Sequence, residues 1–203
     1  MAKGILIVVS GPSGTGKGTI CSELLRDSEI KYSTSMTTRK PRPGEIDGED
    51  YFFVSREEFL QIKADDGFLE TAETYGNFYG TPRAEVLDMI DEGRDVLLEI
   101  DPKGALQVRD AYPETVMVFI LPPSMAELRR RIESRASDSQ EVIERRLSEA
   151  YAELEYMSEY NYSVVNDDLY EAVAAIEAIV KAEHCKVTPE EVDEQLEQYK
   201  EER

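Results

Sequence analysis

The sequence predicts an open α/β fold built on a parallel sheet, and two observations carry this prediction. Four apolar runs have the composition of strands that are buried on both faces, and long helical patterns lie between them. A glycine-rich loop follows the first of these runs directly and opens a helix, which we expect from Thr19 to about Leu25. The four expected strands cover residues 5–9, 95–100, 116–121 and 163–165.

The glycine-rich loop has the form of a nucleotide phosphate-binding loop, G-x-x-x-x-G-K-[ST]. Its glycines let successive backbone N–H groups turn toward one anion, and the positive end of the following helix faces the same place. Lys17 stands where its ammonium reaches the β- and γ-phosphates of a nucleotide. The alternative, a strand-to-helix turn that binds nothing, gives no reason for this lysine. The residues expected to bind the phosphates are Gly11, Pro12, Ser13, Gly14, Thr15, Gly16, Lys17, Gly18 and Thr19.

Gly18 departs from the usual form of this loop, because a Ser or Thr at that position commonly ligates Mg²⁺. Thr19 is the next hydroxyl along the chain. Mg²⁺ also keeps several of its waters in proteins, so it can be held largely through water. We therefore expect either Thr19 or water to stand in for the missing hydroxyl.

Residues 33–84 interrupt the alternation of strands and helices. They are rich in Thr, Tyr, Pro and Gly and contain short strand-like pieces such as residues 50–54, so they predict an inserted subdomain. Thr81 and Pro82 then have the pattern of a helix start, with the threonine as the cap, and Gly93 has that of a helix end. The face of this helix that is expected in the core carries Val86, Leu87 and Ile90.

The C-terminal third is expected to be mostly helical. Residues 125–160 are long and charged, and the break at residues 134–139 predicts a helical hairpin. A second core-facing helix carries Ala172, Ile176, Ile179 and Val180. Residues 188–191 have the pattern of a capping box that opens a terminal helix. We expect that helix to dock on the core or on another subunit, with local packing favoured, through a stripe of Val192, Leu196 and Tyr199.

Composition narrows the class of protein. A chain of 203 residues, 41% of them hydrophobic, can bury one sizeable core with inserted subdomains. No apolar run approaches the roughly 18–20 residues that cross a bilayer, and the N-terminus does not have the pattern of a signal peptide. Two distant cysteines and one histidine argue against a disulfide framework, a zinc site and a histidine-based triad. These features predict a protein of the reducing cytoplasm.

The charge balance is strongly acidic, with 23 Lys and Arg against 43 Asp and Glu and a formal net charge of -20. Such a surface repels nucleic acids and anionic membranes, so we expect neither as a partner. Against this background, local clusters of basic residues mark the places where phosphates are expected to bind. The two clusters are Arg39, Lys40 and Arg42, and Arg129, Arg130, Arg131 and Arg135.

The first basic cluster lies in the inserted subdomain. Arg39 and Arg42 are three residues apart and are stiffened by Pro41 and Pro43, which predicts a preset fork for a phosphate. The alternative is a solvated basic loop. The hydroxyls that could complete a phosphate site are those of Ser35, Thr37, Thr38 and Tyr51.

Together with the phosphate loop, several further motifs make the chain resemble the guanylate kinases. The segment Thr-Thr-Arg-x-Pro-Arg-x-Gly-Glu that begins at Thr37 is far more specific than the loop alone. It is followed by Tyr-Gly-Thr at 79–81, Leu-Glu-Ile-Asp at 98–101, Leu-Pro-Pro-Ser at 121–124 and Val-Asn-Asp-Asp at 165–168. These motifs occur in order over residues 4–185, and the last residues of the chain fall outside the resemblance.

The resemblance implies a P-loop NTPase fold, with a parallel sheet core and helices on both of its faces. The core would comprise residues 1–33, 85–124 and 148–186, with a GMP-binding subdomain at 34–84, a helical lid at 125–147 and a C-terminal helical tail at 187–203. The implied reaction is the transfer of the γ-phosphoryl group of ATP to GMP, and to dGMP as well, with Mg²⁺ as cofactor. The implied partners are these nucleotides, and the enzyme would be a monomer or a homodimer.

The resemblance also assigns roles residue by residue. It implies that the phosphate of GMP is bound by Arg39, Arg42, Tyr51 and Tyr79. It implies that the guanine base is read by Glu70, Ser35, Thr81 and Asp101. It implies that Asn166 lies near the adenine of ATP, and that the catalytic cations are Lys17, Arg39, Arg131, Arg135 and Arg146.

Each assignment has a plainer alternative. Glu70 could be a surface carboxylate at a strand end, Asp101 a helix cap and Asn166 a turn cap. The arginine run could be a solvated helix face paired with neighbouring glutamates, which is the expected state of Arg129 and Arg130. The glutamates expected to pair with the run are Glu127, Glu133 and Glu141. Ala136 stands where the family commonly has glycine, which puts the flexibility of the lid in question.

Two other functions compete with GMP phosphorylation. A kinase of another nucleoside or sugar phosphate would share the loop, but Glu70 with Ser35 and Thr81 favours guanine, which presents two donors to a carboxylate. A scaffold domain without turnover would resemble the same family, but such domains typically lack an intact phosphate loop. Here Lys17 and all the matched arginines are present, which favours an enzyme.

Overall fold

The computed structural model describes residues 3–26, 28–134, 139–187, 192 and 196–200. Its core is a five-stranded sheet in the order β2-β7-β1-β8-β9, with every neighbouring pair parallel. The strand at its centre, β1, pairs with β7 on one side and with β8 on the other. The strands are β1 (Leu6–Ser10), β2 (Lys31–Tyr32), β7 (Val96–Glu99), β8 (Val116–Leu121) and β9 (Tyr162–Val165).

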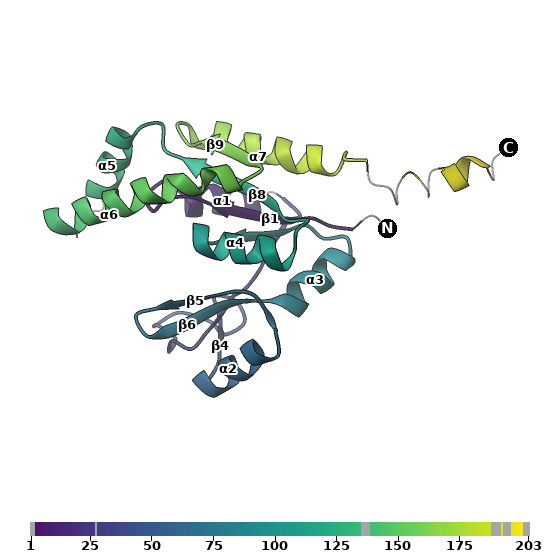
Figure 1. Ribbon diagram of the computed structural model, residues 1–203, viewed down its shortest axis with the longest axis horizontal. Helices are drawn as coiled ribbons and strands as arrows, with labels where there is room; N and C mark the ends of the chain where they lie inside the picture. The colour runs from purple at the N-terminus through teal and green to yellow at the C-terminus, as the bar shows by residue number, and fades with distance from the viewer. Residues whose placement is uncertain (1–2, 27, 135–138, 188–191, 193–195, 201–203) are drawn as a thin grey trace.

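Helices cover both faces of this sheet, as Figure 1 shows. Side chains alternate along β1, so Ile7 and Val9 join one apolar cluster while Leu6 and Val8 join another. The first cluster is closed by α1 (Lys17–Arg26) and α7 (Leu169–Glu183), and the second by α3 (Arg83–Asp91) and α4 (Pro102–Ala111). The prediction of a parallel sheet between two helical layers is therefore confirmed.

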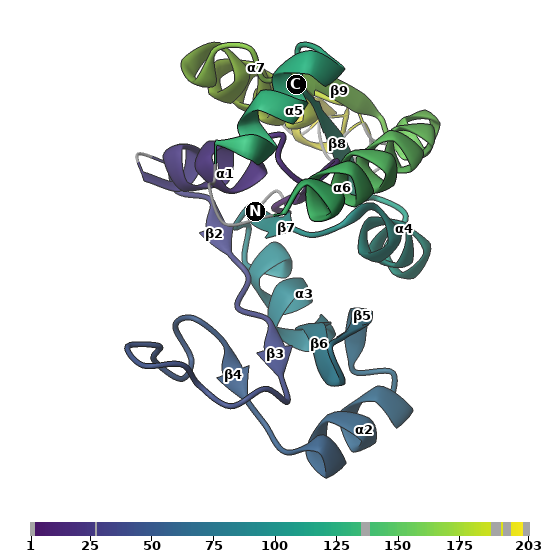
Figure 2. The same ribbon diagram turned by 90° about the vertical axis from the view of Figure 1, so that its left-hand side faces the viewer.

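The inserted segment forms a second, smaller sheet that lies beside the core (Figure 2). Phe59 of the helix α2 stacks on Phe68 and Phe78, with ring centroids 4.4 and 5.4 Å away, and so holds this sheet together. Gln107 of α4 exchanges two hydrogen bonds with the backbone of Thr71, which joins the small sheet to the core. The elements are β3 (Met36–Thr37), β4 (Phe52–Phe53), α2 (Arg56–Ala64), β5 (Phe68–Thr74) and β6 (Asn77–Pro82), with the strands in the order β4-β3-β6-β5.

The expected helical hairpin follows β8. It consists of α5 (Met125–Glu133) and α6 (Gln140–Glu153), and a short 3₁₀ helix, η1 (Leu154–Glu159), comes after it. Ser124 and Ser139 cap the two helices by accepting hydrogen bonds from the backbone N–H groups of Glu127 and Val142. The hairpin has an apolar core of its own, formed by Leu128, Ile132, Ile143, Leu147 and Ala150.

Several expected boundaries need correction. Helix α1 begins at Lys17 rather than Thr19 and extends to Arg26. Helix α3 has Pro82 as its N-cap residue without any side-chain cap, so the prediction of Thr81 as the cap was wrong. The hydroxyl of Thr81 donates instead to Glu70, across the small sheet.

The C-terminal tail is only partly described. The capping box at residues 188–191 lies outside the described residues, while residues 192 and 196–200 are helical. Val192, Leu196 and Tyr199 are all exposed, so the described part of the stripe is not buried against the core. Within the described ranges, no helix combines the length and the apolar character that crossing a membrane requires.

Candidate active site

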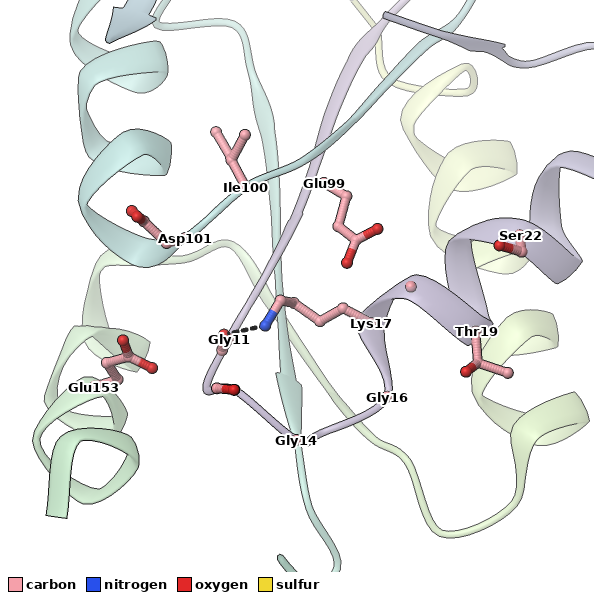
Figure 3. Close-up of a pocket in the computed structure, with 12 residues that line it drawn as sticks. Gly11, Gly14, Gly16, Lys17, Thr19, Ser22, Glu99, Ile100, Asp101 and Glu153 are labelled. Carbon is pink, nitrogen blue, oxygen red and sulfur yellow. Dashed lines mark hydrogen bonds between the residues drawn. The ribbon is translucent and has the colours of Figure 1, made fainter. Parts of the chain in front are cut away.

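A cavity of about 730 Å³ opens at the carboxyl ends of β1 and β7, where open α/β sheets bind their ligands (Figure 3). The loop between β1 and α1 forms one wall, and the end of β7 forms the opposite wall. Glu153, at the end of α6, closes one side. The cavity therefore combines the predicted phosphate loop with residues that lie far from it in the sequence.

Glycine is required at two positions of this loop. Gly11 has a φ of 137°, and a Cβ there would lie 2.4 Å from the carbonyl oxygen of Ile120. Gly16 has a φ of 92°, and a Cβ there would lie 2.4 Å from Nδ2 of Asn166. The loop can thus press closely against β8 and the end of β9 only because these side chains are missing.

Lys17 lies over the loop, with its ammonium directed into the cavity (Figure 3). Its Nζ donates hydrogen bonds to the carbonyl oxygens of Gly11 and Pro12, the second at 3.0 Å. Burial lowers the pKa of Lys17, and the nearby carboxylate of Glu99 partly offsets this effect. Lys17 thus places a cation in the wall of the cavity, beside the glycine-rich loop.

Two arginines of the helical hairpin reach the same loop. Arg131 donates to the backbone oxygen of Asn166 at 2.9 Å and to that of Thr15 at 3.4 Å. Arg146 donates to Oγ of Ser13 at 3.0 Å. Arg135, the third arginine expected here, lies outside the described residues.

The other arginines of the run are held in ion pairs on the helix surface. Arg129 pairs with Glu144 and Glu133, and Arg130 pairs with Glu127, which also binds Arg131. The expectation of a solvated, ion-paired face for Arg129 and Arg130 is confirmed, with Glu127 and Glu133 among the expected partners. The shortest ion pair of Arg129 is with Glu144, which was not among them.

Asn166 supports the loop from the end of β9. Its residue is only 7% exposed, and its side-chain amide donates to the carbonyl oxygen of Thr15 at 2.7 Å. The backbone oxygen of Asn166 accepts from Arg131 in addition. The plainer interpretation of Asn166 as a turn cap was therefore wrong, because the side chain joins β9 to a loop far away in the sequence.

A second polar group forms where the small sheet meets α4. Glu70 is only 7% exposed, and its Oε1 accepts a hydrogen bond of 2.9 Å from the Thr81 hydroxyl. A Cβ at Gly104 would lie 3.2 Å from Oε2 of Glu70 and 3.6 Å from Oδ1 of Asp101, so both carboxylates converge on the start of α4. The plainer interpretation of Glu70 as a surface carboxylate was wrong.

The two carboxylates of this group differ in their chemistry. Burial is the main cause that raises the pKa of Glu70 to about 7, although the hydrogen bond from Thr81 lowers it. Asp101 is the N-cap of α4, because its Oδ1 accepts from the backbone N–H of Gly104 at 2.8 Å. The alternative of a helix cap is thus correct for Asp101, and its side chain lines the phosphate-loop cavity as well.

A further polar group lies around the loop between β3 and β4 of the small sheet. Arg39 binds Glu45 through two parallel hydrogen bonds of 2.9 Å, and its guanidinium lies 5.3 Å from the centre of the Tyr51 ring. Tyr79 contacts Tyr51 edge-on, with centroids 6.0 Å apart. The backbone N–H of Arg42 also donates to Glu45, at 2.7 Å, while Arg42 itself is exposed. Arg39, Tyr51 and Tyr79 are thus brought together.

Glu45 organises this group, although its sequence pattern did not predict it as a site residue. The ion pair with Arg39 is the main cause that lowers the pKa of Glu45 to about 2 and raises that of Arg39. Its place at the end of the segment that begins at Thr37 was the available signal. Ser35, by contrast, is half-buried in the segment that leads into β3, where its carbonyl oxygen accepts from the N–H of Phe52 at 3.0 Å.

A parallel sheet with a glycine loop, a lysine at its first helix and arginines converging on that loop defines the class of P-loop nucleotide-binding proteins. Comparison with known proteins narrows the class. The sequence profile of the guanylate kinases matches residues 3–183. This chain belongs to the guanylate kinase family.

Individual relatives agree with this assignment. A guanylate kinase of Clostridium tetani is 54% identical over 187 residues, which cover 92% of this chain and 90% of the relative. One of Desulfitobacterium hafniense is 55% identical over 185 residues, or 91% of this chain and 92% of the relative. The crystal structure of guanylate kinase from Anaplasma phagocytophilum matches with a TM-score of 0.72 and 38% identity, covering 92% of this chain and 89% of that one. As a member of this family, the chain is an ATP:GMP phosphotransferase.

Proposed function

We propose that this chain transfers the γ-phosphoryl group of ATP to GMP, and to dGMP, by a Mg²⁺-assisted in-line displacement between two sites of its own. The observation that carries the proposal is the position of Asp101. This residue lines the phosphate-loop cavity and also neighbours Glu70, so it connects the donor site with the acceptor site. All the residues in this proposal belong to one chain, so a monomer, or each protomer of a homodimer, could catalyse the transfer by itself.

The proposal divides the chain into three working parts. Residues 34–84 would bind GMP, which their separate sheet and its own aromatic packing support. Residues 125–147 would act as the lid, which the separate apolar core of α5 and α6 supports. The remaining core, residues 1–33, 85–124 and 148–186, would bind ATP, and the tail at 187–203 follows it.

On the donor side, the backbone of residues 11–19 would cradle the phosphates of ATP. Lys17 would bind the β- and γ-phosphates, and Arg131 and Arg146 would stabilise the charge on the phosphoryl group in transit. Their hydrogen bonds to the loop support these roles. Arg135 is proposed to join them, and Asn166 to hold the loop beside the adenine. Closure of the lid over both substrates would exclude water and prevent the hydrolysis of ATP.

On the acceptor side, Arg39, Arg42, Tyr51 and Tyr79 would bind the phosphate of GMP. A planar guanidinium suits a dianionic phosphate, and Glu45 would hold that of Arg39 in orientation until the phosphate arrives. Phosphate oxygens are already anionic at neutral pH, so the transfer needs no general base.

Selection of guanine would rest on the buried group around Glu70. Its carboxylate would accept hydrogen bonds from N1–H and the 2-amino group of guanine, with help from Ser35, Thr81 and Asp101. Adenine lacks this pair of donors and would leave the buried carboxylate with only its hydrogen bond from Thr81, and unpaired acceptor sites of this kind are how a site rejects a wrong substrate strongly.

The residues around the cavity fit a hard cation. Three carboxylates line the cavity, those of Glu99, Asp101 and Glu153. Among the described residues they do not converge into a group of three that could hold a metal ion by itself, but Mg²⁺ is commonly bound through one or two carboxylates together with waters and the phosphates of the substrate. These residues would hold Mg²⁺ bound with ATP, directly or through its waters, and the ion would supply positive charge beside the phosphates. The sequence-based alternatives for holding it are Thr19 and water.

The direct test is to measure ADP formation from Mg-ATP with GMP, dGMP, AMP, CMP and UMP offered separately. We expect turnover with GMP and dGMP alone. Comparable turnover with another monophosphate would contradict the role of Glu70, and no turnover with any of them would contradict the proposed reaction.

A further inference from the structure

The edge strand of the small sheet is paired by a side chain of α4, which lies beside this sheet in Figure 1. Strand β5 ends the order β4-β3-β6-β5, so one of its sides has no neighbouring strand for its backbone N–H and C=O groups. Nε2 of Gln107 donates to the carbonyl oxygen of Thr71 at 3.2 Å, and Oε1 of Gln107 accepts from the N–H of Thr71 at 3.1 Å. The side-chain amide thus pairs with one residue of β5 as the backbone of a further strand would.

The residue beside this pair is the buried carboxylate of the small sheet. Glu70 directly precedes Thr71 in β5, and the register of β5 with β6 shifts between Phe68 and Glu70. An irregularity of this kind bends a strand and changes the direction of its side chains. The bond to Gln107 therefore holds the backbone immediately after the bend from which Glu70 projects.

Helix α4 also meets the carboxylate of Glu70 itself. Gly104 is buried and lies three residues before Gln107 in α4, and a Cβ on it would lie only 3.2 Å from Oε2 of Glu70. Glycine destabilises a helix relative to alanine, so the close approach is what this residue provides in return. Because Oε1 of Glu70 is bound by Thr81, the carboxylate is held between β6 and α4.

We propose that Gln107 is a positioning residue for guanine recognition, which binds Thr71 and so fixes the orientation of Glu70 against α4. Asp101 caps the same helix, so the bond aligns the carboxylate of the inserted subdomain with a residue of the core. Gly104 contributes by leaving the space that the carboxylate occupies. The inference rests on the proposed function and deepens it, because it names what aligns the base-reading residue.

The competing explanation is that Gln107 only satisfies backbone groups at the edge of a sheet. Its loss would then loosen the small subdomain as a whole and weaken every monophosphate bound there by the same factor. Loss of a positioning residue for Glu70 would instead affect the base that offers both donors more than a base that offers one. The two explanations therefore differ in the selectivity of the variant.

The test compares GMP with IMP, whose base keeps N1–H but lacks the 2-amino group. Calorimetry measures the dissociation constant of each, and their ratio is the preference for guanine. The variant is Gln107→Met, which keeps the length of the side chain but removes both hydrogen bonds. The matched control is Gln61→Met, which removes a surface hydrogen bond to Asp65 in helix α2 of the same subdomain. Circular dichroism confirms that each protein is folded.

We expect Gln107→Met to lower the preference for GMP over IMP by about threefold to tenfold, mainly through weaker GMP binding, with the affinity for an ATP analogue unchanged. The control should keep the preference within about twofold, since it leaves the bond between β5 and α4 intact. Equal weakening of GMP and IMP, or an unchanged preference, would overturn the inference and leave the proposed function standing. Failure of the unmodified protein to bind GMP would overturn both together.

A second variant acts on the carboxylate without touching Gln107. Gly104→Ala adds a Cβ 3.2 Å from Oε2 of Glu70, so the carboxylate must shift although Thr81 still binds it. We expect the preference for GMP over IMP to fall by about threefold or more, as for the loss of part of one hydrogen bond. Alanine favours a helix over glycine, so this loss would not result from a weakened α4. An unchanged preference would overturn the alignment of Glu70 by this helix.

Discussion

Replacing Glu70 by glutamine is expected to weaken the use of GMP while leaving the use of ATP unchanged. The carboxylate is buried against Thr81, so an amide in its place keeps one acceptor but turns an N–H₂ group toward the donors of guanine. A hydrogen bond to a charged group contributes about 1.5–3 kcal/mol. Losing one such bond lowers kcat/KM for GMP by about 10- to 100-fold. Steady-state kinetics with each substrate varied in turn measures this change, and equal losses for GMP and ATP would refute the reasoning.

The raised pKa of Glu70 makes the same prediction testable without a mutation. Burial raises this pKa to about 7, so below that pH the carboxyl is protonated and loses an acceptor site for guanine. The KM for GMP should therefore rise as the pH falls through about 7, while the KM for ATP stays flat. Glu70→Gln should abolish this dependence. A KM for GMP with the same pH profile in both proteins would assign the titration to another group.

The stability that Glu70 gives the folded protein should depend on pH in the opposite direction to GMP binding, and should increase as the pH falls. Because the folded-state pKa of Glu70 lies above the usual value of 4.5, the stability that this group contributes is present below about 4.5 and is lost as the pH rises through about 7. Glu70→Gln removes the buried charge, so at pH 8 the variant should gain about 1–3 kcal/mol in free energy of unfolding. Urea unfolding of both proteins at pH 5 and pH 8 measures this difference in free energy of unfolding. A gain of the same size at both pH values would refute the claim that Glu70 carries a buried charge at pH 8.

Three further substitutions test the donor side. Lys17→Ala should reduce turnover by orders of magnitude with unchanged thermal unfolding, and near-normal activity would remove the argument from the phosphate loop. Arg135→Ala should lower kcat more than it raises KM, and an effect on KM alone would mean that it binds only the ground state. Asn166→Ala leaves the carbonyl oxygen of Thr15 with only the longer hydrogen bond of 3.4 Å from Arg131. It should cost about 1–3 kcal/mol in free energy of unfolding and raise the KM for ATP, and unchanged values in urea unfolding and kinetics would contradict its support of the loop.

The phosphate loop and the fold class were predictable because the information is local. The loop is nine consecutive residues after a buried strand, and glycines and a lysine in this arrangement are typical of a loop that binds nucleotide phosphates. Strands buried on both faces are apolar throughout, so they could be recognised from their own residues without knowing which strands pair with them. The limits of β8, residues 116–121, agree with the prediction for the same reason.

The proposed acceptor site was predictable from the residues only in part. Arg39 and Arg42 could be proposed from their spacing, but the pairing of Arg39 with Glu45 depends on how the loop folds back on itself. Glu70 had no local signal, and without the resemblance to a family it would have been taken for a surface carboxylate. Its burial results from contact with Thr81 and α4, which only the assembled small sheet provides.

The sequence by itself thus determined four of the sheet's five strands and the glycine-rich loop with its lysine, because each follows from residue types within one short segment. The fifth strand, β2, was missed because its two residues are exposed and form no apolar run. Tertiary structure alone decided which distant residues meet that loop. Arg131 lies 116 residues after Thr15 and Asn166 lies 151 residues after it, yet both bind its carbonyl oxygen. Glu99 faces Gly18 for the same reason, since parallel strands bring their carboxyl ends to one edge of the sheet whatever their separation along the chain.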